Sequence, residues 1–248
     1  MELKDSKILI TGGGRGLGKY LAEHLLEDVE KVIILEKDKT LLNELVPHAK
    51  LLSYVCDITD PVSVETIVKE IFETHGGVNI CINNAGIIHS EPLVNILSKG
   101  EKKHNLGLWE KVINLNLNAV FYVSSNVVEN MVLRKLKGVI INISSISAHG
   151  NMGQSAYSAS KAGVEALSRT WSKELAMFKI RAVSIAPGFF NTDSTKESLS
   201  ESMLAKWQKS VPLGRLGEMD ELLLAVKFII ENEYFNGKTL SLDGGLTI

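Results

Sequence analysis

Short apolar runs rich in β-branched residues alternate along the chain with longer amphipathic segments. The runs cover residues 7–11, 31–36, 51–56, 78–84, 138–144, 180–186 and 238–242. Helical periodicity fills most of the gaps, most clearly over 62–76 and 164–178. Such alternation predicts a parallel sheet with helices on both faces, and nearly continuous apolar strands are typical of a sheet buried on both sides. We therefore predict an α/β, doubly wound fold of about seven strands.

The domain organisation is inferred from the absence of any sequence feature that would separate two domains. We find no repeat, no low-complexity segment and no linker, so residues 1–248 are expected to form a single domain. Two long polar segments, 88–107 and 188–217, break the alternation, and the second has its own short helical stretch. Long loops often serve as lids or binding loops. We interpret both as substrate-loop insertions; for 88–107 a tolerated insertion without function is an equal alternative.

The charge and apolar content restrict the partners and the compartment. A net charge of −2 does not favour a broad nucleic-acid or acidic-membrane surface. No apolar run approaches the ~20 residues that span a bilayer, and the strand at 7–10 leaves no room for a signal peptide. Cys56 and Cys81 lie in apolar runs and are interpreted as small buried side chains. The sequence thus predicts a cytoplasmic protein with no nucleic-acid or membrane partner.

A glycine-rich segment, "TGGGRGLG" (Thr11–Gly18), follows the first predicted strand and opens a helix. Such a turn lets backbone N–H groups approach a pyrophosphate at a helix N-terminus. Glu36 ends the second predicted strand, 18 positions after Gly18. A carboxylate there binds the ribose hydroxyls of a dinucleotide and repels a 2′-phosphate. The alternative for Glu36 is a solvated strand end.

Tyr157 and Lys161 stand four residues apart in "YSASK", with only small residues between them. On a helix such positions share one face. Taken alone, this spacing favours an ordinary surface pair over a shared site.

Further motifs occur in a fixed order along the chain. They are "CDITD" with Asp57, "NNAG" (Asn83–Gly86), "NLNL" with Asn116, "NISS" before "YSASK", "APG" (Ala186–Gly188) with Thr192, and "LDGG" (Leu242–Gly245). Together with the glycine-rich segment these motifs are spread along nearly the whole length of the chain. The sequence resembles the short-chain dehydrogenase/reductase family in its compact form, which is similar to 3-oxoacyl-carrier-protein reductases and 3-hydroxyacyl-CoA dehydrogenases and has a Rossmann-type fold.

The resemblance implies an NAD(P)-dependent oxidoreductase that transfers a hydride between a nicotinamide cofactor and a secondary alcohol or ketone. It implies that Tyr157 is the general acid/base and that Lys161, with the oxidised nicotinamide, lowers the pKa of Tyr157 and holds the cofactor ribose. Ser145 would orient the substrate oxygen, and Asn116 would hold a water in a proton relay.

The residues that the resemblance and the motifs assign to the cofactor are Gly12, Arg15, Gly16, Leu17, Gly18, Glu36, Asp57, Ile58, Asn84, Ala85, Gly86, Tyr157, Lys161, Pro187, Gly188 and Thr192. Glu36 favours NAD. NADP remains an alternative, because Arg15 and Lys37 could serve a 2′-phosphate.

The catalytic serine is ambiguous. The usual spacing of the family, thirteen residues before Tyr157, reaches Ser144, whereas the strand end "NISS" selects Ser145 at twelve. We prefer Ser145, because the strand end decides which side chain faces the cleft.

Several alternatives remain open at this point. The substrate is a small alcohol or ketone, or else a 3-oxoacyl thioester; a protein that senses NAD(H) without turnover is the non-enzymatic alternative. Family members assemble as tetramers or dimers, here through helices that hold 108–134 and 154–177. His89 and His149 either contact substrate or are solvated, and the basic run 99–103 is either solvated or meets an acidic carrier. "HNLG" offers His104 without a second ligand at metal spacing, so we predict no metal.

Overall fold

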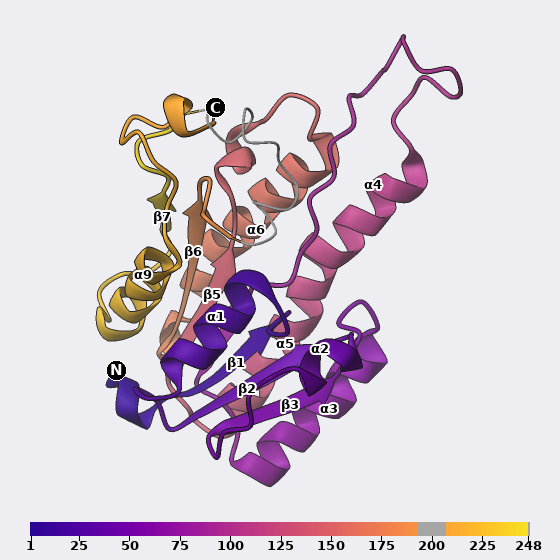
Figure 1. Cartoon of the computed structure of the whole chain (residues 1–248). Helices are drawn as coiled ribbons and strands as arrows, with labels where there is room; N and C mark the ends of the chain where they lie inside the picture. The colour runs from indigo at the N-terminus through magenta and orange to yellow at the C-terminus, as the bar shows by residue number, and fades with distance from the viewer. Residues whose placement is uncertain (193–206, 248) are drawn as a thin grey trace.

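The computed structural model describes residues 1–192 and 207–247, and its seven strands form one parallel sheet (Figure 1). The strand order is β3-β2-β1-β4-β5-β6-β7. The strands are β1 Lys7–Thr11, β2 Lys31–Glu36, β3 Leu51–Val55, β4 Ile80–Asn83, β5 Gly138–Ile143, β6 Ile180–Pro187 and β7 Thr239–Leu242. All seven predicted strands are confirmed, with ends within two residues of the expected ones, since β-branched runs bounded by turn residues leave little freedom of placement.

The helices fill the connections between the strands. They are α1 Gly16–Leu25, α2 Lys39–Asn43, α3 Pro61–His75, α4 Leu106–Ile113, α5 Ala119–Leu133, α6 Ser155–Glu174 and α9 Met219–Glu231, with a π-helical turn η2 at Asn114–Asn118 and 3-10 turns η1 Leu3–Asp5, η3 Ile146–His149 and η4 Ala176–Phe178. The expected helix over 164–178 is wrong at both ends. It begins at Ser155, where the face that holds Ala156 and Ser160 is buried, because the packing of one face stabilises a helix in a protein more than intrinsic propensity does.

Two apolar layers cover the sheet. Helices α1 and α9 pack on one face, against residues such as Ile8, Ile10 and Ile82. Helices α3, α5 and α6 pack on the other, against residues such as Leu9 and Cys81 (Figure 1). Successive residues of β1 thus point to opposite faces, and both faces are fully buried. This is why the strands read as continuous apolar runs.

The position of the site follows from the strand order. The chain moves outward from β1 to β2 and β3, then returns to place β4 on the other side of β1. Loops that leave β1 and β4 therefore diverge, and a crevice at the carboxyl ends of such strands is where ligands bind in open α/β sheets. The glycine-rich segment follows β1, and "NNAG" begins at the end of β4.

The insertion, residues 88–107, projects from the molecule ahead of α4 (Figure 1). Up to residue 105 it holds only isolated bridges, between Glu91 and Gln154 and between Val94 and Lys103. Leu97 is 87% exposed. The second predicted loop, 188–217, is described only in part, since 193–206 lie outside the described residues; residues 207–210 are helical.

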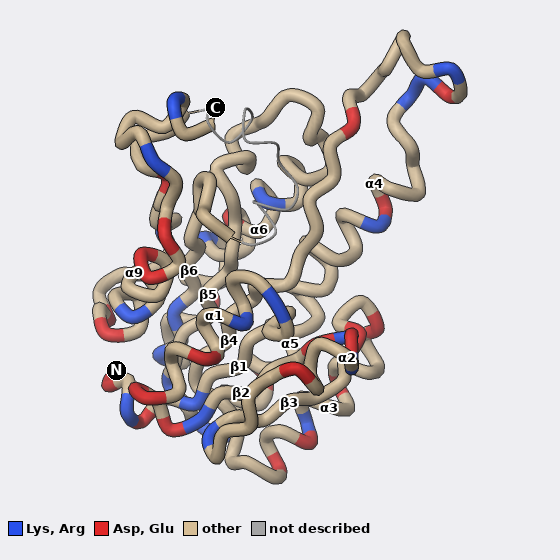
Figure 2. The backbone as a smooth tube through the Cα atoms, viewed as in Figure 1, with Lys and Arg blue, Asp and Glu red and all other residues tan. Residues whose placement is uncertain are grey.

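The remaining bulk expectations concern cysteines and membranes. Cys56 and Cys81 are buried and free, as expected from their apolar surroundings. Among the described residues, the helices are all too short or too polar to cross a bilayer. In the view of Figure 2, acidic and basic residues are interspersed over the chain.

Candidate active site

The glycine-rich turn is locked to the end of β4. The Asn84 side chain donates to the carbonyl oxygens of Thr11 (3.0 Å) and Gly12 (3.1 Å). The Thr11 hydroxyl accepts the backbone N–H groups of Asn84 and Ala85, each at 3.1 Å. A Cβ on Gly18 would lie 2.2 Å from the Gly12 oxygen, so only glycine permits this approach of α1 to the turn.

The same turn leaves room where a phosphate group would lie. Gly16 is the first residue of α1, has φ +54° and has no atom within 4 Å of a hypothetical Cβ. Gly12 has φ +66° and adjoins Ala85, whose Cα a Cβ would approach to 2.9 Å. A glycine-rich turn with left-handed residues at Gly12 and Gly16, at the N-terminus of a helix, fits a pyrophosphate. The residues present therefore fit a dinucleotide.

Glu36 closes the adenosine side of this turn. Its carboxylate accepts the backbone N–H of Gly14 at 3.3 Å and that of Lys37 at 2.8 Å. The Lys37 ammonium is paired with the Asp57 carboxylate. Partial burial raises the pKa of Asp57, but hydrogen bonds from Lys37 and Thr59 outweigh this and hold it below its usual value. Arg15 is exposed and makes no side-chain ion pair within the described residues. Of the two cations considered for a 2′-phosphate, Lys37 is thus already neutralised.

Tyr157 and Lys161 lie in the first turns of α6, and both are buried. The Lys161 ammonium lies 5.7 Å from the centroid of the Tyr157 ring and donates to the Ile143 carbonyl oxygen at 2.6 Å. Burial lowers the pKa of Lys161 to about 8.

Burial also raises the pKa of Tyr157, and a hydrogen bond with Ser145 offsets this only in part. The expected lowering of the Tyr157 pKa includes the charge of the oxidised nicotinamide and stays a prediction; in the chain alone the direction is upward. The physical reason is that desolvation of the phenolate dominates while the lysine ammonium is directed to a backbone carbonyl.

The two neighbouring serines point to different surroundings. Ser144 donates at 2.9 Å to the carboxylate of Glu165, a buried residue of α6. Ser145 accepts the N–H of Ser147 at 3.2 Å and hydrogen-bonds with Tyr157. Of the two serines, Ser145 is thus the one in contact with Tyr157, and Ser144 is held against Glu165.

Asn116 lies in the π-helical turn between α4 and α5, and its side chain is 1% exposed. Its amide exchanges two hydrogen bonds with the backbone of Ile87, each of 2.9 Å. A Cβ on Gly86 would lie 3.2 Å from the Asn116 oxygen and 3.7 Å from the Lys161 ammonium. Asn116, Gly86 and Lys161 are thus brought together, and π-turns of this kind are frequent at functional sites.

The remaining predicted residues lie on either side of this centre. Pro187 ends β6 and pairs with Leu242, and a Cβ on Gly188 would lie 2.8 Å from the Asp243 backbone. Thr192 donates its N–H to the Phe190 carbonyl and is the last residue described before 193–206. Ile58 is buried beside Asp57.

Sequence reasoning missed a buried polar ladder behind the site. Asn83 donates to Asn142 at 2.7 Å, Asn142 to Ser168 at 2.8 Å, and Ser168 lies 2.7 Å from Ser184. Strand register explains it, since Asn83, Asn142 and Ser184 are neighbours across β4, β5 and β6. The ladder ties α6, which carries Tyr157, to the sheet; the polar interruptions of three apolar strands were the available signal.

Comparisons with known proteins agree with this architecture. A family model described as short chain dehydrogenase matches residues 6–202. A 3-oxoacyl-[acyl-carrier-protein] reductase of Thermotoga maritima is 35% identical, with all of both chains covered. That of Vibrio cholerae is 34% identical over 99% of each chain. The ligand-free aldohexose dehydrogenase of Thermoplasma acidophilum superposes with a TM-score of 0.85 at 28% identity, covering 98% of this chain and 94% of that one.

Proposed function

The chain belongs to the short-chain dehydrogenase family, and from this premise we propose that Tyr157 is the general acid/base of its reaction. As a member it is a nicotinamide-dependent oxidoreductase that acts on a CH–OH group and interconverts a secondary alcohol and a ketone. The observation that carries the assignment of Tyr157 is its position between Ser145 and Lys161 at the carboxyl edge of the sheet.

Each residue of the site has a role in this proposal. The nicotinamide, when bound, accepts or supplies the hydride. Tyr157 removes the hydroxyl proton in oxidation and returns it in reduction. Ser145 donates a hydrogen bond to the substrate oxygen. The Lys161 ammonium holds the cofactor ribose and stabilises the phenolate of Tyr157. This stabilisation must outweigh the rise in the Tyr157 pKa that burial causes. Asn116 keeps the loop at Ile87 in place beside Lys161 and positions a relay water.

We propose NAD as the preferred cofactor. The Glu36 carboxylate is held at the glycine-rich turn, where it would repel a 2′-phosphate. Lys37, one of the two cations that could compensate, is paired with Asp57.

The cofactor proposal is tested by titrating NADH and NADPH into the unmodified chain and into Glu36→Ala. We expect NADH to bind at least about tenfold more tightly, a difference of ~1.4 kcal/mol, and the substitution to narrow that ratio. Glu44→Ala, on the exposed end of α2, is the control and leaves the ratio unchanged. Tighter binding of NADPH by the unmodified chain would reject the proposal.

A 3-oxoacyl thioester is the substrate class that we place second. Relatives named for that activity align with the whole chain at 34–35% identity. Lys99, Lys102 and Lys103 of the projecting insertion are also exposed, and Figure 2 shows basic residues at its far end, where an acidic carrier could bind. Lys103 pairs with Glu101, which weakens this second argument.

The function is tested with a panel of secondary alcohols, ketones and 3-oxoacyl thioesters, each with NADH and NADPH. The expected result is turnover with at least one class that Tyr157→Phe abolishes. The variant Lys99→Ala/Lys102→Ala separates the two forms of a thioester substrate. If it lowers turnover of the carrier-bound 3-oxoacyl thioester and leaves turnover of the free thioester unchanged, the carrier-bound form is the substrate. Binding of NADH without turnover of any class would count against the assigned catalytic residues.

We further propose that the chain forms a single domain, works in the cytoplasm and assembles as a homo-oligomer, a tetramer or dimer. Exposed apolar side chains on α4 and α5, such as Leu106, Trp109 and Phe121, support an interface there. Light scattering of the purified chain, alone and as Phe121→Glu, tests the assembly. A monomeric unmodified chain would overturn it.

A further inference from the structure

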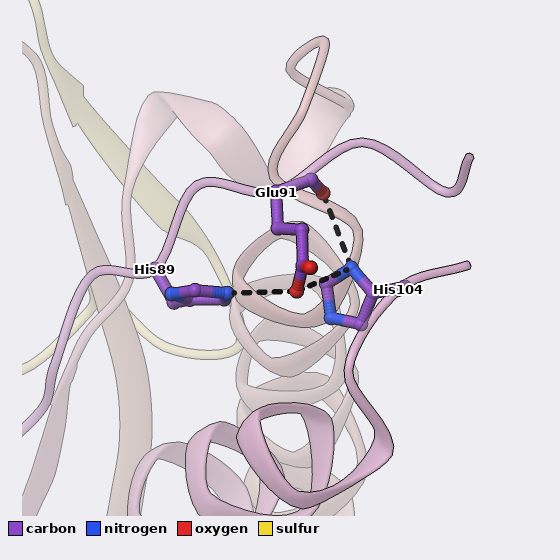
Figure 3. A group of neighbouring side chains, drawn as sticks. All are labelled: His89, Glu91 and His104. Carbon is purple, nitrogen blue, oxygen red and sulfur yellow. Dashed lines mark hydrogen bonds and ion pairs between the residues drawn. The ribbon is translucent and has the colours of Figure 1, made fainter. Parts of the chain in front are cut away.

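A second cluster of chemically able side chains lies within the insertion. His89, Glu91 and His104 converge there, with both imidazole rings beside the Glu91 carboxylate (Figure 3). One ring nitrogen of each histidine and a Glu91 oxygen all lie within 4.8 Å of one another. The prediction of no metal rested on His104 having no second ligand nearby in the sequence, and the fold supplies two.

His104 carries a buried nitrogen without a partner. Its side chain is 7% exposed, and its Nε2 has no hydrogen-bond partner within the described residues. Its Nδ1 lies 3.2 Å from the carbonyl oxygen of Glu91 and 3.5 Å from the Glu91 carboxylate, both of which only accept, so the ring proton belongs on Nδ1. Nε2 then holds an unused lone pair, and a buried polar atom left unsatisfied costs ~1–3 kcal/mol.

This state of an imidazole is typical of a metal ligand. Histidines that bind metals nearly always donate their other ring N–H to a carboxylate or a backbone carbonyl, which fixes the tautomer and the ring. His104 has that arrangement already. Protonation of both ring nitrogens would not satisfy His104, because its Nε2–H would then be a buried donor without an acceptor.

The remaining two ligands have the spacing and exposure that a metal needs. His89 Nε2 lies 3.2 Å from Glu91 Oε2, and two ligands of a tetrahedral ion at bonds of about 2.0–2.1 Å lie roughly 3.3 Å apart. The side chains of His89 and Glu91 are 24% and 27% exposed, which leaves an entry path and space for a water ligand.

We propose that His89, Glu91 and His104 bind one divalent transition-metal ion of the Zn²⁺ class. Two imidazole nitrogens and one carboxylate oxygen suit Zn²⁺, whereas Ca²⁺ and Mg²⁺ prefer oxygen ligands.

The site joins the insertion to the starts of two helices. The backbone N–H of Glu91 donates to the Gly153 carbonyl at 2.6 Å, next to Gln154, the residue that precedes α6. The Glu91 carboxylate accepts the N–H of Asn105 at 3.1 Å, and Asn105 caps α4. An ion bound at Glu91 therefore fastens the insertion to both helices, and we assign it a structural role that is independent of the proposed hydride transfer.

The test uses the tag-free full-length chain, freed of metal by dialysis against a chelator. Calorimetric titration with Zn²⁺ is expected to give one saturable site and a higher melting temperature. Co²⁺ is expected to give the visible absorption of a tetrahedral or five-coordinate ion. Glu91→Gln, which keeps an oxygen to accept the Asn105 N–H, and His89→Gln should each weaken binding at least tenfold. His104→Gln should do the same.

Matched controls separate the cluster from other metal-binding groups. His149→Gln, an exposed histidine outside the cluster, and Glu101→Gln, an exposed carboxylate of the same insertion, should leave binding unchanged. Glu91→His, which supplies a nitrogen in place of the carboxylate oxygen, should retain the site. If buried His104→Gln fails to fold, Glu91→Gln and His89→Gln still decide. Absence of saturable binding, or equal loss in cluster and control variants, overturns the proposal.

Discussion

The carboxyl edge of the sheet and the insertion at 88–107 are held in place by different means. At the edge, Asn84, Asn116 and Lys161 are each fixed by hydrogen bonds to backbone atoms of neighbouring strands or loops. The insertion has no regular structure before α4 and exposes Leu97 and other apolar side chains. It meets the body mainly through Glu91 and Gln154.

The difference fits our proposal that the edge carries the chemistry and that the insertion serves another role. A proton must be transferred over a fixed short distance, so the groups that move it need the rigid sheet and its register beneath them. A binding loop can change its residues without disturbing the core. The predictions below test whether the two regions are as independent as this comparison implies.

Tyr157→Phe should have the largest effect, because it removes the proton-transferring hydroxyl and keeps the ring. We expect turnover to fall by about 10²–10⁴-fold while NADH affinity is nearly unchanged. Tyr234→Phe, at a fully exposed position, is the control. Steady-state kinetics with fluorescence titration of NADH gives both quantities. Normal turnover by Tyr157→Phe would show that the reaction does not depend on this edge of the sheet.

The stability of the two regions is compared with one pair of substitutions. Ile82→Ala empties a fully buried position in β4 and should lower the free energy of unfolding by ~2–5 kcal/mol. Leu97→Ala, in the insertion, should change it by less than ~0.5 kcal/mol. Urea denaturation measures both. A large cost for Leu97→Ala would show that the insertion packs against something, such as a second copy of the chain.

The adjacent serines divide function from packing within the edge itself. Ser145→Ala should reduce turnover about 10²-fold, as loss of a hydrogen bond to a developing oxyanion does, with little change in melting temperature. Ser144→Ala leaves Glu165 without its buried donor and should cost ~1–3 kcal/mol of stability, with turnover retained. If Ser144→Ala is the inactive variant, the assignment is off by one residue.

Lys161 provides the smallest effect, a pH dependence of stability in the cofactor-free chain. Its pKa is about 8 when folded and 10.5 in the ordinary case. Between these two pH values the unfolded chain binds one more proton than the folded chain, so the free energy of unfolding rises with pH. The same free energy decreases as the pH falls toward 8. From pH 8 to 9.5 the expected gain is about 2 kcal/mol.

The measurement is urea denaturation of the unmodified chain and of Lys161→Met across this range. The difference in slope between the two belongs to Lys161, whatever else titrates. Lys102→Met, an exposed lysine of the insertion, should keep the slope of the unmodified chain. Equal slopes for Lys161→Met and the unmodified chain would mean that the ammonium is not desolvated as the fold implies.

The sequence by itself determined the sheet and the turn that opens it. Runs such as 31–36 are apolar between their first and last residues, which is typical of strands in a parallel sheet covered on both faces. The steric demands of Gly12 and Gly18 can likewise be inferred from local order, because a turn between a strand and a helix needs glycine wherever backbone approaches backbone. The Tyr157–Lys161 pair was placed correctly for the same reason, as helical spacing is local.

Only the tertiary structure decided the properties that depend on distant neighbours. The direction of the Tyr157 pKa depends on burial and on where the Lys161 ammonium points, and Ile143 lies on another element. Ser144 differs from Ser145 in its hydrogen-bond partner, because its hydroxyl donates to Glu165, which lies twenty positions or more along the chain. His104 acquires Glu91 and His89 because the insertion folds back on itself. Periodicity records which face of an element is buried; it does not record which side chains meet across the space that the fold encloses.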